Sequence, residues 1–187
     1  MKRLFAAVKI HPDEGLTSLY WSIRKSLMDE RITWVDPDNM HITLKFFGET
    51  PDHHIPGIAV ALKEAVKGIS PFTLNLNNTG IFGSSYRPRV IWFGIDRHAE
   101  MLRLAENVKA SLEVIGIESD RQNFVPHLTV GRIKLIDDKK HFQRVMEKYS
   151  KVEIKKEEVK EYHLFDSILS PQGPTYVVLE SFTLGED

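Results

Sequence analysis

Two spacings of apolar residues alternate along the chain, and together they predict a mixture of helices and strands. Apolar residues three and four positions apart share one face of a helix, whereas unbroken or alternating apolar runs are typical of strands. The first pattern predicts helices within 16–27, 55–66, 102–115 and 142–149. The second predicts strands within 4–10, 41–48, 72–76, 90–95, 152–165 and 175–184, and another beginning at 127. This mixture indicates an α+β protein.

Capping and turn-forming residues mark several of the expected boundaries. Asp13 and Asp138 stand where helices begin, and their carboxylates can accept hydrogen bonds from the first backbone amides. Gly116 stands where the third helix is expected to stop. Residues 36–39 form a turn cluster before the strand at 41. No low-complexity segment or linker interrupts this series of elements.

One tetrapeptide pattern, His-x-Thr-x, occurs twice, at 41–44 and at 127–130, each time at the start of a predicted strand. Residues i and i+2 of a strand lie on the same face. His41 and Thr43 are therefore expected on one face, and so are His127 and Thr129. The opposite faces are expected to hold the apolar residues Ile42, Leu44, Phe46, Leu128 and Val130.

The two motifs are separated by just under half of the chain, and each is followed by a predicted helix. This spacing suggests two α+β lobes of similar design with one motif strand in each. We therefore expect residues 1–187 to form a single bilobal domain. Outside the motifs the repeat is weak.

Composition limits the possible functions. The 187 residues include 42% hydrophobic and 27% charged residues, which is typical of a globular protein. A net charge of −1 provides no general basic field for nucleic acid, so any RNA contact must come from a local patch. The absence of cysteine excludes disulfides, thiolate catalysis and sulfur-ligated zinc.

The first residues resemble the start of a signal peptide, but the apolar run 4–8 is too short and Lys9 ends it. No apolar stretch approaches the length that spans a bilayer. We therefore expect a soluble, cytoplasmic protein that does not bind membranes.

The paired motifs suit chemistry at a phosphate. A neutral histidine can accept a proton from water, and a protonated histidine can donate one to a leaving oxygen. Threonine hydroxyls can donate hydrogen bonds to the non-bridging oxygens. The histidines manage the protons, so no metal is required. A cyclic phosphate is the easiest substrate because it is strained and its leaving group is held in place.

Several longer blocks extend the likeness beyond the motifs: 3–8, 40–49, 87–92, 126–132 and the tail 164–184. On these blocks the chain resembles the two-histidine phosphoesterase superfamily. Within it, the chain is most similar to the bacterial and archaeal RNA 2′,3′-cyclic phosphodiesterases, formerly called 2′-5′ RNA ligases. The resemblance covers essentially the whole chain.

The resemblance implies a bilobal, pseudo-two-fold fold in which two antiparallel sheets line a central cleft and the helices lie on the outer faces. It implies hydrolysis of an RNA terminal 2′,3′-cyclic phosphate to a 2′-phosphate, without metal or cofactor. His41 would be the proton donor and His127 the proton acceptor. The partner would be RNA with a cyclic phosphate end, with tRNA-derived ends as one source. The oligomeric state is left open.

Three arginines are candidates for contacts with phosphate. Arg132 follows the second motif, where the family often has arginine near the phosphate. Simple alternation places Arg132 opposite His127, unless Gly131 allows a bulge that re-aims it. Otherwise it is a solvated charge. Arg87 and Arg89 either contact RNA phosphates or keep an edge strand soluble.

Three aromatic residues are candidates for stacking on a base. In a regular strand Phe47 shares a face with His41, although core packing is the favoured role. Phe82 and Tyr86 lie in the loop between two predicted strands. The adjacent His53 and His54 are expected to diverge, to be exposed and to hold no metal. Residues 155–158 are expected to form a solvated strand or hairpin.

Two alternatives to this function stay open. The same site could act on small cyclic nucleotides or on 2′-5′-linked oligonucleotides. The chain could also be an RNA-binding or nucleotide-binding module without turnover, although intact histidines and threonines in both motifs argue against this.

Overall fold

The computed structural model describes residues 1–96, 98–118 and 124–185. Within these ranges four α-helices and nine strands form. The strands are β1 (Lys2–Lys9), β2 (Arg31–Trp34), β3 (His41–Thr50), β4 (Phe72–Gly83), β5 (Pro88–Ile95), β6 (His127–Leu135), β7 (Glu153–Val159), β8 (Glu161–Ser170) and β9 (Gly173–Thr183). The helices are α1 (Glu14–Ser26), α2 (Ile55–Glu64), α3 (Ala99–Val114) and α4 (Lys139–Lys148), with short 3-10 turns η1 (Pro37–Asn39) and η2 (Asp52–His54).

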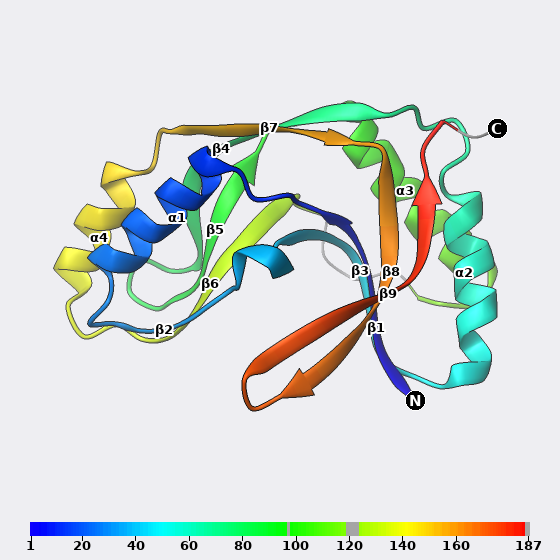
Figure 1. The fold of residues 1–187 in the computed structure, drawn as a ribbon, viewed down its shortest axis with the longest axis horizontal. Coiled ribbons are helices and arrows are strands. Elements are labelled where there is room, and N and C mark those ends of the chain that lie inside the picture. The colour runs from blue at the N-terminus through cyan, green and yellow to red at the C-terminus, as the bar shows by residue number, and fades with distance from the viewer. Residues whose placement is uncertain (97, 119–123, 186–187) are drawn as a thin grey trace.

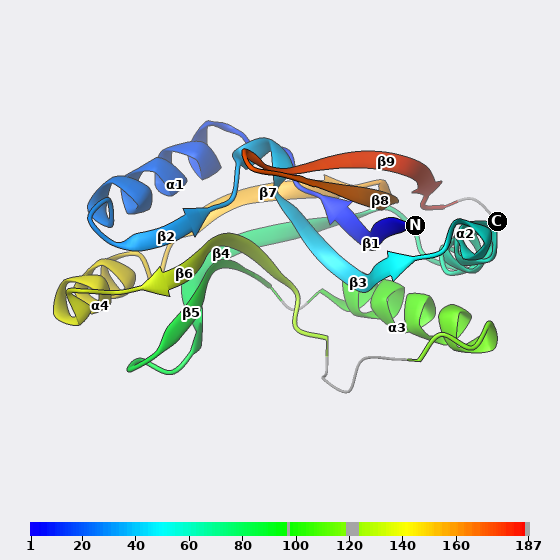
Figure 2. The same cartoon turned by 90° about the horizontal axis from the view of Figure 1, so that it is seen from below.

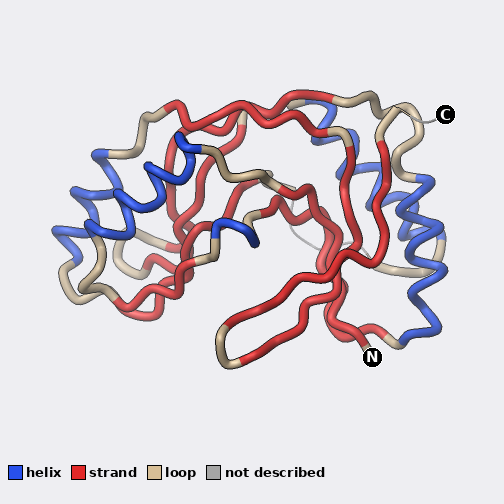
Figure 3. The backbone as a smooth tube through the Cα atoms, in the orientation of Figure 1, coloured by secondary structure: helices blue, strands red, loops and turns tan. Residues whose placement is uncertain are grey.

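The strands form two antiparallel sheets. A four-stranded sheet has the order β3-β1-β8-β9, and a five-stranded sheet has the order β2-β6-β5-β4-β7. Helices α2 and α3 lie beyond the four-stranded sheet and α1 and α4 beyond the five-stranded one (Figures 1 and 2). Figure 3 shows the strands gathered between these two groups of helices. The predicted α+β class with two antiparallel sheets is confirmed, and each sheet holds one motif strand.

Strand β1 is buried on both faces, which explains its unbroken apolar sequence. Leu4, Ala6 and Val8 belong to the main hydrophobic core. Phe5 and Ala7 point the other way and, with Phe165 and the partly buried Tyr176, form a second, smaller apolar cluster. The four-stranded sheet therefore has an apolar surface on both sides.

The predicted strand at 152–165 is in fact two strands in different sheets. β7 pairs with β4 in the five-stranded sheet, whereas β8 pairs with β1 in the four-stranded sheet, and Lys160 lies between them. No pattern in the sequence indicates β2, which is only four residues long and alternates between exposed and half-buried positions. β4 continues to Gly83, past the predicted end at 76, although its later part contains Asn77 and Asn78.

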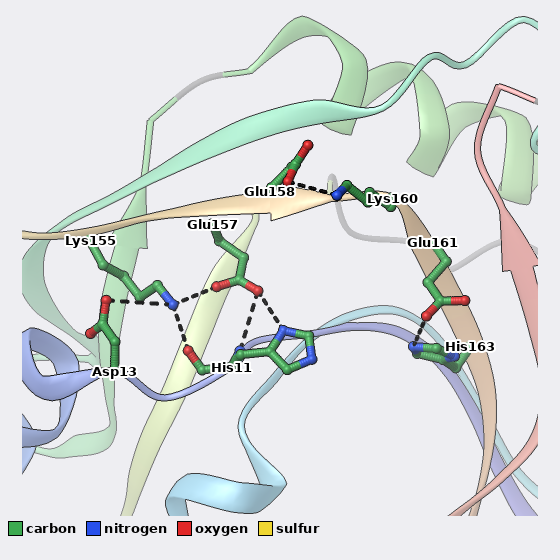
Figure 4. Close-up of polar contacts among 8 residues, drawn as sticks. All are labelled: His11, Asp13, Lys155, Glu157, Glu158, Lys160, Glu161 and His163. Carbon is green, nitrogen blue, oxygen red and sulfur yellow. Dashed lines mark hydrogen bonds and ion pairs between the residues drawn. The ribbon is translucent and has the colours of Figure 1, made fainter.

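A buried polar cluster joins β7 to the link between β1 and α1 (Figure 4). The Lys155 and Glu157 side chains are only 8% and 6% exposed, and their charged atoms lie 2.6 Å apart. The Nδ1 atom of His11 lies 2.7 Å from Glu157, and Lys155 donates to the His11 carbonyl at 2.5 Å. The expectation of a solvated segment is thus wrong for Lys155 and Glu157, which share the inner face of β7. It is confirmed for Lys156 and Glu158, which lie on the outer face.

We predict that Glu157→Ala lowers the free energy of unfolding by roughly 3 to 5 kcal/mol, because it leaves the buried Lys155 ammonium without its closest counter-ion. Urea denaturation would measure this. The matched control is Glu158→Ala on the outer face, whose exposed ion pair with Lys160 should contribute about 1 kcal/mol or less. A loss in Glu157→Ala as small as that of the control would show that the buried pair contributes no more than an exposed one.

Candidate active site

The two motifs meet in one cavity of about 760 Å³ between the sheets. All four motif side chains line it, together with Arg132. His41 and Thr43 come from β3 of the four-stranded sheet, and His127 and Thr129 come from β6 of the five-stranded sheet. Residues far apart in the sequence are thereby brought to facing walls of the same space.

The two histidines are held in the same way. Nδ1 of His41 donates to the carbonyl of Asn39 at 2.7 Å, and Nδ1 of His127 donates to the carbonyl of Val125 at 2.8 Å. A carbonyl oxygen can only accept, so in both rings the Nδ1 nitrogen holds a proton. The Nε2 nitrogen of each ring is therefore the one that can gain or lose a proton during a reaction.

A bulge after each threonine changes which side chains face the cavity. Thr43 pairs with Ala7 and Lys45 with Ala6, so Leu44 is an extra residue in β3. The bulge turns Phe46 towards the cavity, where the simple alternation had placed it on the apolar face.

The residue after Phe46 is displaced as well. A second register shift in β3 leaves Phe47 unpaired, and its ring packs against the main hydrophobic core. This position agrees with core packing and not with stacking on a base.

The second motif strand has an equivalent bulge. Thr129 pairs with Trp92 and Gly131 with Ile91, so Val130 is the extra residue. Arg132 is thereby turned into the cavity. A bulge that re-aims Arg132 is thus present, but it lies at Val130 and not at Gly131. Gly131 itself is needed for packing, since a Cβ atom there would lie 3.0 Å from the Ile32 side chain and 3.2 Å from the Trp34 ring.

His41 is enclosed by two aromatic rings. The ring centroids of Phe5 and Tyr176 lie 4.8 and 5.2 Å from that of His41. This burial lowers the pKa of His41, and the nearby charges of Arg132 and His127 lower it further, against the opposing effect of the Asn39 carbonyl. The free protein therefore favours the neutral form of His41.

The comparisons with known proteins agree with this geometry. The model of the LigT-like phosphoesterase family matches the chain twice, over residues 8–92 and 94–176. The first match contains His41 and the second contains His127. The chain belongs to this phosphoesterase family.

Curated relatives match over nearly the full chain. An RNA 2′,3′-cyclic phosphodiesterase of Aquifex aeolicus is 37% identical over 189 residues, covering 99% of this chain and 100% of the relative. One of Archaeoglobus fulgidus is 34% identical over 181 residues, covering 96% and 99%. A crystal structure of a Thermus thermophilus protein has a TM-score of 0.78 and 29% identity, covering 97% of each chain. The predicted resemblance to the two-histidine superfamily is confirmed.

In this phosphoesterase Asn39 connects the first histidine to the β8–β9 hairpin. Its carbonyl accepts from His41, while its side-chain amide donates to the carbonyl of Pro174 at 3.0 Å. Ser170 at the end of β8 and Gln172 in the hairpin turn line the cavity. Asn39 thus both orients His41 and anchors the β8–β9 hairpin.

The remaining candidates lie outside this cavity or at its edge. Arg87 and Arg89 are exposed and do not line it. Tyr86 is 78% exposed, with the Lys139 ammonium 3.8 Å from the centre of its ring. Phe82 approaches the site through an edge contact with His127, at 4.7 Å between centroids.

Some cavity residues were missed by the sequence analysis: Arg3, Phe5, Trp34, Asn39 and Tyr176. No local pattern marks them, because their place depends on which strands become neighbours.

No group of three or more metal-ligating side chains that could hold an ion occurs within residues 1–96, 98–118 and 124–185. His53 and His54 are exposed as expected, although their rings do not diverge but meet at 4.3 Å. In the same ranges no helix is long and apolar enough to cross a bilayer.

We predict that Tyr176→Ala raises the pKa of His41 towards the usual histidine value of about 6.5, because water then reaches the imidazolium. NMR titration of the histidine Cε1–H resonances would measure it. Val177→Ala, an exposed neighbour on β9, should leave the pKa unchanged. A pKa of His41 that stays or falls in Tyr176→Ala would show that the tyrosine does not exclude water from the ring.

Proposed function

We propose that residues 1–187 act as a single catalytic unit that hydrolyses the terminal 2′,3′-cyclic phosphate of RNA to a 2′-phosphate. One observation carries the proposal: both motif histidines use Nδ1 to bind a backbone carbonyl and keep Nε2 for chemistry in the same cavity. The names of the Aquifex and Archaeoglobus relatives support the choice of substrate.

The reaction needs two proton transfers. His127 Nε2 accepts a proton from water, whose oxygen forms a bond to phosphorus. The bond from phosphorus to the 3′ oxygen breaks, and His41 Nε2 donates a proton to that oxygen. Each transfer typically contributes about 10² to 10⁴ in rate. The non-bridging oxygens are held by Thr43, Thr129 and Arg132, which stabilise the charge that develops on these oxygens.

The bound phosphate prepares His41 for its role as the acid. Burial in the free protein lowers its pKa and so favours the neutral ring. A phosphate anion beside the imidazole has the opposite effect, because an adjacent negative charge stabilises the protonated form. Substrate binding thus supplies the protonation state that His41 needs, while the more open His127 acts as the base.

Both protons and the phosphoryl charge are managed by side chains, so the proposed reaction uses neither metal nor cofactor. The partner is RNA with a cyclic phosphate end, including tRNA-derived ends, and we place the reaction in the cytoplasm. The exposed Arg87 and Arg89, with Tyr86, would meet the RNA farther from the reacting end, whereas Phe82 would meet it beside His127.

The experiment that tests this function is release of a 2′-phosphate from a cyclic-phosphate oligonucleotide in the presence of EDTA. His41→Ala and His127→Ala should each lower turnover by about 10² or more, since each removes one proton transfer. Thr43→Val and Thr129→Val should each lose roughly 10-fold to 10³-fold, since each removes one donor to the phosphoryl group. His53→Ala, at an exposed histidine outside the cavity, is the control.

Near wild-type activity in either catalytic histidine variant would refute the two-histidine mechanism. Activity that disappears in EDTA and returns with a divalent ion would refute its metal independence. Wild-type protein that binds the oligonucleotide without turnover would favour a binding module. A marked preference for small cyclic nucleotides or for 2′-5′ linkages would identify the substrate as one of the two rival classes.

We predict a bell-shaped dependence of kcat/KM on pH. At low pH both histidines are protonated and the base is lost, and at high pH both are neutral and the acid is lost. Burial favours the neutral form of His41 in the free protein, so the lower of the pair's two apparent pKa values, which sets the acidic limb, should lie below about 6.5. Bound phosphate should shift the alkaline limb of kcat above that of kcat/KM. A chemistry-limited profile that is flat between about pH 5 and 9 would contradict the mechanism.

A further inference from the structure

A phenylalanine ring and an arginine guanidinium form a pair on the cavity wall that belongs to the four-stranded sheet. The pair lies farther along this wall than Thr43. The Cζ atom of Arg3 lies 5.2 Å from the centre of the Phe46 ring, and both side chains line the cavity. Phe46 is 48% exposed, which is unusual for a phenylalanine beside the buried aromatic cluster of this sheet. The mechanism proposed above uses neither side chain.

The position of Phe46 corresponds to that of Arg132 in the other sheet. Each residue stands three positions after the motif threonine, beyond an equivalent bulge, and each is turned into the cavity. At these equivalent positions, the five-stranded sheet thus presents a positive charge beside the histidines, whereas the four-stranded sheet presents an aromatic ring. The chemistry at the histidines requires the charge but has no use for the ring.

The cavity offers two guanidinium groups from opposite walls. Among the residues that the structure describes, neither Arg3 nor Arg132 has an ion-pair partner. A terminal cyclic phosphate has a single negative charge, and Arg132 is placed to meet it. A second arginine in the same cavity fits a second phosphate, and in an RNA this is the phosphodiester that links the terminal nucleoside to the one before it.

The pair also has the chemistry that recognises single-stranded RNA. Bases of unpaired RNA stack on aromatic rings, while cationic side chains follow the backbone phosphates. Strands rise by about 3.3 Å per residue, so Phe46 lies several ångströms beyond Thr43 along the wall. In the free protein the Arg3 guanidinium occupies the ring face that a base would take.

We propose that Phe46 and Arg3 form a subsite for the nucleotide that precedes the cyclic-phosphate end, with its base stacked on Phe46 and its 3′ phosphodiester paired with Arg3. This inference rests on the proposed function and extends it: the enzyme selects RNA chains of two or more nucleotides over cyclic mononucleotides.

The test compares two substrates, adenosine 2′,3′-cyclic phosphate and the dinucleotide ApA with a 2′,3′-cyclic phosphate end. Wild-type enzyme should have a higher kcat/KM for the dinucleotide. Phe46→Ala should reduce the ratio of the two kcat/KM values by about 10-fold, as expected for one lost stacking contact. Phe46→Tyr keeps a ring and should preserve the ratio, and Phe46→Leu keeps apolar volume without a ring and should lose it.

Arg3→Gln should reduce the same ratio. It should also make the logarithm of the dissociation constant for the dinucleotide product depend less steeply on the logarithm of salt concentration, by a slope of about 0.7 for one lost phosphate contact. The matched controls are Trp21→Ala and Arg24→Gln. These residues form a similar pair at 4.7 Å on α1, outside the cavity, and Trp21 is 49% exposed. Both controls should keep the wild-type ratio.

An unchanged ratio in Phe46→Ala, or an equal loss on both substrates, would overturn the subsite while leaving the proposed function intact. A wild-type enzyme without preference for the dinucleotide would also overturn it. Wild-type protein that hydrolyses neither substrate would refute the proposed function, and the subsite with it.

Discussion

A hydrogen bond from an imidazole to the backbone two residues before it is the interaction on which the site depends. It is made twice, by His41 to Asn39 and by His127 to Val125. Because the acceptor is a carbonyl, the bond selects one tautomer and fixes the ring at the start of its strand. Chemistry between the sheets then requires only that the two strands face each other. The polar cluster around Glu157 and the two-sided core of β1 hold parts of both sheets in this relation.

The bulges add asymmetry to a nearly symmetric site. Both motif strands insert one residue after the threonine, at Leu44 and at Val130. The same kind of bulge therefore turns Phe46 into the cavity from one wall and Arg132 from the other. The surroundings of the histidines differ too, since His41 is enclosed by Phe5 and Tyr176. A substrate with distinct ends can bind such a cavity in only one productive direction.

Apolar periodicity and the repeated motif were sufficient to predict the helices, the motif strands and the four residues at the centre of the site. What they could not predict depends on neighbouring strands. Alternation within β3 placed Phe46 in the core, because a bulge is visible only in the register with β1. Lys155 and Glu157 look solvated as a charged run, since nothing local indicates that they bind each other and His11. The short β2 has too few residues to show a period.

At Lys160 the chain passes from the five-stranded sheet to the four-stranded sheet, and this late passage determines when the four-stranded sheet can be completed during synthesis. β1 and β3 are synthesised early, but their sheet is completed by β8 and β9, the last strands that the structure describes. Tyr176, which encloses His41, belongs to that last hairpin. Pairings of such long sequence separation form slowly, because a large loop must close before they are made. Until the β8–β9 hairpin is in place, β1 therefore has an open edge and His41 lacks one of the two rings that enclose it.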